Sequence, residues 1–217
     1  MAVHPQDILP FDAQKLLGIA VATPQHPQQR HVGIIYCYGT SRPRMCHLAW
    51  HHRLRDEDLP ADYQWGESGL DPINRVFMAA YVSLLPQNAS VVPYGITTYG
   101  PCFDEQGRYV DQPLGFGLTC ATFILDVYAR RGFNLLREDQ WPERADDALW
   151  QRLIIEALTT SGASAQHVEA MREHVGAPRF RPEEVAAGCI SEEIPISFDD
   201  ALTLAQEILQ DLQTAAS

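Results

Sequence analysis

GFGLTCATFILDVYARRGF (residues 115–133) joins a glycine-containing loop to an apolar-periodic segment, and a single cysteine, Cys120, lies at the junction. Apolar residues recur here at the spacing of one helix face: Phe123, Ile124, Val127 and Tyr128. Gly132 is the residue type that most often follows the C-terminus of a helix. The stretch therefore predicts a helix from about Cys120 to Arg131 with its apolar stripe buried.

A cysteine at the start of a helix has a chemical consequence. Unpaired backbone N–H groups and the helix dipole favour an anion there, so they stabilise a thiolate, which is the nucleophilic form of cysteine. The same N–H groups can donate to the oxyanion that forms when sulfur attacks a carbonyl. Free cysteines are more often plain core residues. A catalytic interpretation of Cys120 therefore needs a base nearby.

Histidines that could act as this base are concentrated early in the chain, where six of the eight lie within residues 1–52. His31 opens the apolar segment HVGIIY, and His47 lies within MCHLAWHH. The residues GTSRPR between these segments have turn composition, so the two segments predict a β-hairpin. A cysteine hydrolase needs one imidazole to take the thiol proton and a polar group to orient that imidazole. Two histidines on adjacent strands can supply both.

The hairpin register decides which histidine lies beside His31, because a slip of one residue moves every side chain to the other face. A symmetric turn would put His52 opposite His31. A bulged or asymmetric loop would bring His47 or His51 there instead. The residues alone leave these three candidates open.

A family resemblance is carried by three motifs. TCATFILDVYARRGF (119–133) resembles the nucleophile helix of the NlpC-type papain-like cysteine peptidases, although Thr119 stands where that family usually has Asp. HVGIIY (31–36) resembles the strand that carries the family's base, and CHLA (46–49) resembles the next strand. In this sequence the two histidines precede the cysteine. The circularly permuted branch of the family, which includes the lecithin:retinol acyltransferase-like proteins, has the same order.

The resemblance implies roles for three residues. Cys120 would be the nucleophile, His31 the base and His47 the residue that orients His31, in a thiol-dependent amidase or peptidase that forms an acyl-thioester. The substrate would be a peptide, amide or acyl compound, and neither cofactor nor metal is implied. The alternatives are acyl transfer at the same site, or a binding domain that keeps the fold without catalysis.

Composition excludes several function classes. The formal net charge is −12, and residues 137–217 hold 16 acids against 6 bases, so we expect no nucleic-acid partner. No segment resembles a membrane span or a signal peptide, which favours a cytoplasmic protein, although an effector exported without a signal would look alike. The five cysteines include no C-x-x-C pair, so they indicate neither disulfides nor a zinc site. Zinc binding by His47 and His51 is disfavoured because their segment reads as a strand.

Strands early and helices late indicate an α+β fold. With the resemblance, we expect one permuted papain-like domain over 1–217: a small antiparallel sheet packed against the nucleophile helix, and an acidic helical C-terminal extension at 137–217. The expected elements are strands at 16–23, 31–38 and 45–52, loops at 24–30 and 56–71, and helices near 72–85, 146–159, 164–175 and 198–213.

Three further expectations concern single side chains. The helix after Asp71 has an apolar stripe that we expect to be buried: Ile73, Val76, Phe77, Ala80, Tyr81 and Leu84. Tyr94 lies in the loop-rich stretch before Cys120, where it could line a cleft or bind an oxyanion, although packing is the commoner role. His167 and His174, on a predicted helix, are expected at the surface.

Overall fold

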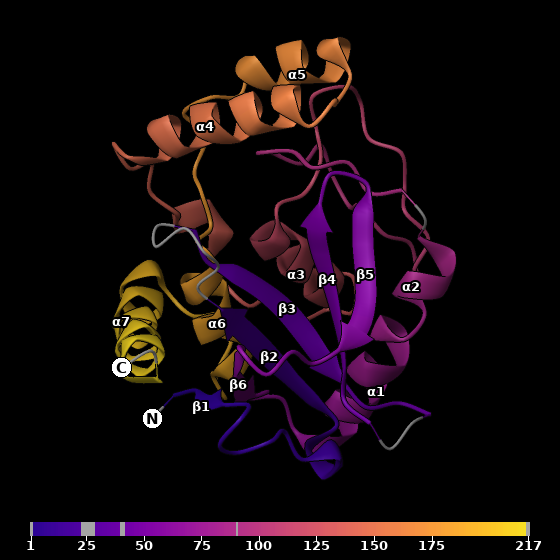
Figure 1. Cartoon of the computed structure of the whole chain (residues 1–217), viewed down its shortest axis with the longest axis vertical. Helices are drawn as coiled ribbons and strands as arrows, with labels where there is room; N and C mark the ends of the chain where they lie inside the picture. Colours follow the sequence, from indigo (N-terminus) through magenta and orange to yellow (C-terminus); the bar gives the residue numbers. More distant parts are fainter. Residues whose placement is uncertain (1, 23–28, 40–41, 90, 216–217) are drawn as a thin grey trace.

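The computed structural model describes residues 2–22, 29–39, 42–89 and 91–215. The fold is α+β, as predicted, and is built on an antiparallel six-stranded sheet with strand order β1-β6-β2-β3-β4-β5. The strands are β1 (His4–Pro5), β2 (Leu17–Ala22), β3 (His31–Tyr36), β4 (Arg44–Trp50), β5 (Arg53–Asp58) and β6 (Gln64–Glu67). Figure 1 shows the helices arranged around this sheet.

The sequence-based prediction of the sheet is right for β2, β3 and β4 and wrong for residues 56–71. That stretch was expected to be a surface loop, yet it contains the end of β5 and all of β6. β5 is an edge strand whose residues are charged apart from Leu54, and its acids accept hydrogen bonds from Arg44 of β4. Most of the loop predicted at 24–30 lies outside the described residues.

The β3–β4 register determines which histidine lies beside His31. Ile34 pairs with Cys46, and Tyr36 with Arg44, a regular register that differs by three residues from the one that would put His52 opposite His31. His52 therefore lies at the far end of β4, in the tight turn to β5, where its φ is 57°. Gly33 lies so close to His47 that a Cβ on it would be 2.9 Å from the His47 Cβ. The chain thus brings His47 toward His31.

The helix predicted from residues 115–133 is confirmed as α3 (Cys120–Ala129). Thr119 caps its N-terminus in a reciprocal arrangement, in which the Thr119 hydroxyl accepts from the Thr122 N–H and the Thr122 hydroxyl accepts from the Thr119 N–H. Gly132 follows the helix with φ at 86°. The apolar stripe is buried against β3 and β4, which fixes Cys120 at the edge of the core.

Helix α1 (Pro72–Val82) begins where predicted, because Asp71 accepts hydrogen bonds from the N–H groups of Ile73 and Asn74. Its predicted buried stripe is wrong in part, since Ile73 is 81% exposed. The buried residues lie in the second half of the helix: Met78, Ala79, Tyr81 and Val82. This half supplies the apolar contacts, whereas Arg75 in the first half pairs with Glu67 of β6. α2 (Leu85–Asn88) follows it.

Four helices make up the C-terminal part: α4 (Asp147–Thr160), α5 (Ala165–Arg172), α6 (Pro182–Ile190) and α7 (Phe198–Ala215). α6 was not predicted, because it is buried nearly all round and therefore lacks an amphipathic period. It packs on β2, β3, β6 and α3, with α7 outside it (Figure 1). No described helix is both long and apolar enough to cross a bilayer.

Gly69 marks the tightest contact between the sheet region and α6. Its N–H donates to the Cys189 carbonyl at 2.9 Å, and a Cβ on it would lie 1.9 Å from the Ser191 carbonyl oxygen. The colliding atom belongs to the backbone, so no side-chain rotation can relieve the overlap.

We predict that Gly69→Ala lowers the free energy of unfolding by about 2 kcal/mol or more, as overpacking against backbone does. Gly100→Ala is the control, because a Cβ there meets nothing within 4 Å. Urea denaturation of both variants measures the difference. Equal midpoints for the two variants would contradict the close contact.

Candidate active site

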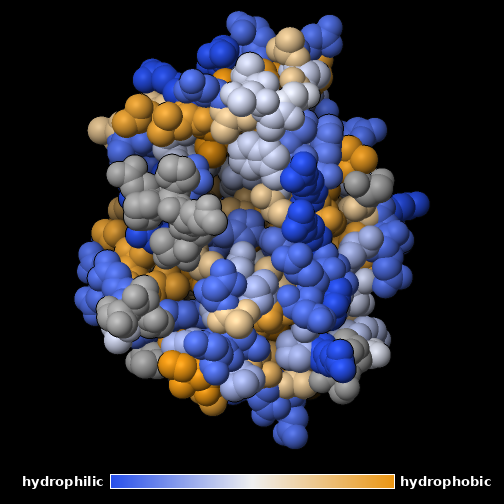
Figure 2. All heavy atoms as spheres, in the orientation of Figure 1, coloured by the Kyte–Doolittle hydropathy of each residue, from blue (hydrophilic) through white to orange (hydrophobic). Residues whose placement is uncertain are grey.

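A cavity of about 400 Å³ lies between the sheet and the C-terminal helices, and it contains the three predicted site residues, Cys120, His31 and His47. Its walls come from β3, β4, β5, the start of α3, α4 and residues 179–182. Figure 2 shows this face of the molecule hollowed beneath α4. Segments far apart in the chain therefore meet at one cavity.

Cys120 is the first residue of α3 and is 6% exposed. Burial raises the pKa of its thiol to about 11, while the backbone N–H groups of Val32 and Ala121 act in the opposite direction. The sequence predicted a thiolate stabilised by the helix start. At this buried position desolvation outweighs that effect, so the resting thiol is protonated at neutral pH.

His31 and His47 are joined by a hydrogen bond of 2.6 Å between His31 Nε2 and His47 Nδ1. The rings meet edge to face, with centroids 4.8 Å apart. Burial, and then the neighbouring His47, lower the pKa of His31 to about 3. His31 is therefore a neutral imidazole across the physiological range, which is the form that can accept a proton.

Glu57 extends this pair into a chain of three side chains. Its Oε1 lies 3.1 Å from His47 Nε2, and its side chain is 37% exposed. Burial lowers the pKa of His47, and the Glu57 carboxylate is the largest opposing influence. Sequence reasoning did not find Glu57, because β5 was not recognised as a strand next to β4.

The carboxylate of Glu57 determines which ring nitrogens carry protons. A carboxylate only accepts, so His47 donates from Nε2 and its neutral ring must accept at Nδ1. His31 then donates from Nε2 to His47, which leaves His31 Nδ1 with a free lone pair. The chain thus holds His31 in the tautomer whose free nitrogen is a base.

Tyr94 lines the same cavity and is held by two other histidines. His51 Nδ1 accepts from the Tyr94 N–H at 3.1 Å, and His167 Nε2 donates to the Tyr94 carbonyl at 2.9 Å. His167 also accepts, at Nδ1, from the Gly115 N–H at 3.2 Å. His167 was expected at the surface and is buried, because it ties together two loops that the sequence does not show as neighbours.

These contacts assign different places to the rival histidines. His47 lies against His31, whereas His51 stacks on His52 with centroids 3.8 Å apart and on His167 at 5.3 Å. The second cluster therefore fixes the Tyr94 backbone. Among the described residues, no group of three or more His, Cys, Asp or Glu is arranged to hold a metal ion.

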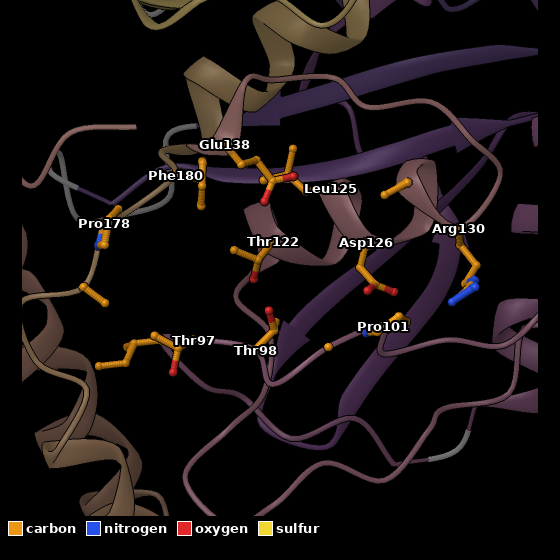
Figure 3. Close-up of a pocket in the computed structure, with 14 residues that line it drawn as sticks. Thr97, Thr98, Pro101, Thr122, Leu125, Asp126, Arg130, Glu138, Pro178 and Phe180 are labelled. Carbon is orange, nitrogen blue, oxygen red and sulfur yellow. The ribbon is translucent and has the colours of Figure 1, made fainter. Parts of the chain in front are cut away.

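A larger cavity of about 570 Å³ lies along another face of α3 (Figure 3). Thr122 and Asp126 of α3 face it together with Thr97 and Glu138, and its described lining holds neither cysteine nor histidine. The Asp126 carboxylate already accepts from the N–H groups of Cys102 and Phe103, at 2.8 and 3.2 Å. The smaller cavity is therefore the one with nucleophile and base.

The buried histidines predict a pH dependence of stability. Burial lowers the pKa of His51 from its ordinary value of 6.5 to about 4. Between these two pH values the His51 imidazole is therefore protonated in the unfolded chain and neutral in the folded chain. The free energy of unfolding is then lost as pH falls from about 6.5 towards 4. His51→Asn, which keeps an acceptor for the Tyr94 N–H, should lose less stability between pH 7 and 5 in urea titrations. Equal losses in both proteins would contradict a neutral, half-buried His51.

Comparisons with protein-family models, curated proteins and solved structures return no significant match for this chain.

Proposed function

We propose that this protein is a thiol-dependent hydrolase, an amidase or peptidase, that acts through an acyl-thioester at Cys120. One observation carries the proposal: the hydrogen-bonded chain Glu57–His47–His31 opens on the cavity that Cys120 lines. A core thiol needs no tautomer-fixed imidazole beside it. A nucleophilic thiol does, because it must lose its proton to react.

The proposed fold is the permuted papain-like one. It is supported by a cysteine at the start of a helix that packs on an antiparallel sheet, with histidines on β3 and β4 of that sheet. We propose one domain over 1–217, in which 137–217 are an extension, because α6 packs on the sheet and α4 contributes a cavity wall. The five free thiols suit a reducing compartment such as the cytoplasm.

The proposed reaction begins with both partners neutral. His31 Nδ1 takes the thiol proton as Cys120 Sγ attacks the substrate carbonyl carbon, and His47 and Glu57 stabilise the imidazolium that forms. The tetrahedral intermediate collapses to a thioester when the leaving amine takes the proton from His31. Water, deprotonated by His31, then attacks the thioester and releases the acid and the thiol.

The oxyanion of these steps would be held at the start of α3. The backbone N–H groups there are donors of the kind that oxyanion holes use. Tyr94 adds a phenol whose pKa is raised by burial and by the neighbouring Cys120, so its hydroxyl keeps its proton and can donate. The cluster of His51 and His167 holds the Tyr94 backbone in place for this role.

Acyl transfer at the same site is the second candidate, and one observation favours it. Trp50, Trp150 and Phe180 give the cavity an apolar wall. Such a wall can hold an acceptor amine or hydroxyl against the thioester and reduce the access of water.

We predict that p-nitrophenyl acetate acylates Cys120, so that a burst of nitrophenolate accompanies a gain of one acetyl group in the intact mass. Cys120→Ala should abolish the burst and keep the fold. Cys102→Ala is the matched control, since Cys102 is a second buried thiol whose pKa is raised, first by burial. If wild type and Cys120→Ala react alike, the protein is a binding domain and the proposed chemistry is wrong.

Glu57→Gln should lower the acylation rate roughly tenfold, because the imidazolium formed in the transition state loses its carboxylate. The acid limb of the pH–rate profile should also move to lower pH, since the Glu57 carboxylate opposes the lowering of the His47 pKa. A purely structural role would not move that limb. Asp58 is the next carboxylate on β5, and it accepts a hydrogen bond from Arg44. The control variant Asp58→Asn should therefore leave both the acylation rate and the acid limb unchanged.

A further inference from the structure

Arg179 lines the cavity of Cys120 and His31. It forms no ion pair in the described part of the chain, and its Nε is buried without a hydrogen-bond partner. Burial lowers its pKa, and the neighbouring Arg181 acts in the same direction. A guanidinium stays charged at any ordinary pH, so a cation without a direct ion pair lies in the cavity of the nucleophile.

The carboxylates nearest to Arg179 are engaged elsewhere. Asp147 lies 3.2 Å from the Arg144 guanidinium and 3.4 Å from that of Arg181. Glu183 lies 3.3 Å from Arg30. Both carboxylates raise the Arg179 pKa from a distance, yet neither forms a direct ion pair with its guanidinium.

The position of Arg179 is built into the fold. Its guanidinium stacks on the Trp150 ring, with Cζ 3.7 Å from the ring centroid, and its backbone carbonyl accepts from Arg144. Arg144 is itself held by Glu184 and Asp147, both of which are 1% exposed. A buried network thus presents a planar cation that has little freedom to leave the cavity.

Resting on the proposed function, we infer that the substrate carries a carboxylate close to its scissile carbonyl, and that Arg179 binds this group. A stacked, planar guanidinium pairs with a carboxylate through two parallel N–H donors, which a neutral amide cannot match. Leaving a buried cation unpaired is costly, so an anion that enters the cavity gains the missing neutralisation. The substrate class is therefore acidic amides or esters, such as N-acyl amino acids and peptides with a nearby free carboxylate.

Two alkylating reagents that differ in charge test the inference at Cys120 itself. Iodoacetate carries a carboxylate where iodoacetamide carries a neutral amide, and peptide mass spectrometry gives the rate for each at Cys120. The iodoacetate to iodoacetamide rate ratio should exceed that of glutathione roughly tenfold at low salt and fall as salt is added. Arg179→Gln should return the ratio to the glutathione value. An unchanged ratio in this variant overturns the inference.

The same rate ratio provides a control variant, and it also distinguishes failure of this inference from failure of the proposed function. Arg181→Gln removes an equal charge two residues away, from an arginine 2.8 Å from Asp146, and should keep the wild-type ratio. The ratio is defined whatever the absolute rate. If Cys120 reacts no faster than glutathione with either reagent, the proposed function fails while the ratio still tests Arg179.

Direct binding gives a second readout that does not depend on the thiol. It also keeps the inference testable if the Arg179→Gln variant folds poorly. Calorimetric titration of Cys120→Ala with N-benzoylglycine and with its primary amide should show roughly tenfold tighter binding of the carboxylate. Adding Arg179→Lys, which keeps the charge but not the planar fork, should remove most of that difference. Equal affinities for acid and amide in Cys120→Ala, or no binding of the acid, would overturn the inference.

Discussion

The hydrogen bond of 2.6 Å between His31 and His47 is the contact on which the candidate site depends. It depends on the β3–β4 register, which brings His47 rather than His52 toward His31, and on Gly33, which leaves space beside His47. The same sheet then sets β5 beside β4, which brings Glu57 to the other nitrogen of His47. Two successive hairpins, β3–β4 and β4–β5, thus align the side chains of His31, His47 and Glu57.

Desolvation decides the electrostatic character of this site. The start of α3 favours a thiolate, yet burial raises the pKa of Cys120 to about 11 and lowers that of His31 to about 3. Both groups are therefore neutral in this structure. In the proposed reaction the proton would transfer as the substrate carbonyl develops negative charge, which the helix N–H groups and Tyr94 could then stabilise.

Local pattern was sufficient for the parts of the molecule that are local. Residues 115–133 predicted α3 with its cap and stop, and the hairpin composition predicted β3 and β4 with their histidines. Glu57 and the buried position of His167 depend on which strands and loops become neighbours, and no periodicity records that. α6 was missed for a related reason, since a helix buried on every side has no polar face to define a stripe.

The acidic C-terminal region shows how an average charge can mislead about a site. It holds 16 acids against 6 bases, yet the cavity wall from this region presents a cation. The reason is pairing: Arg144 and Arg181 take up the carboxylates around them, so Arg179, stacked on Trp150, keeps its charge. Net charge sets the long-range electrostatic field of a protein. A bound substrate, in contrast, interacts with the few charged side chains of the cavity that have no ion-pair partner within the protein. The proposed specificity of this cavity therefore rests on Arg179, which forms no direct ion pair with the described carboxylates around it.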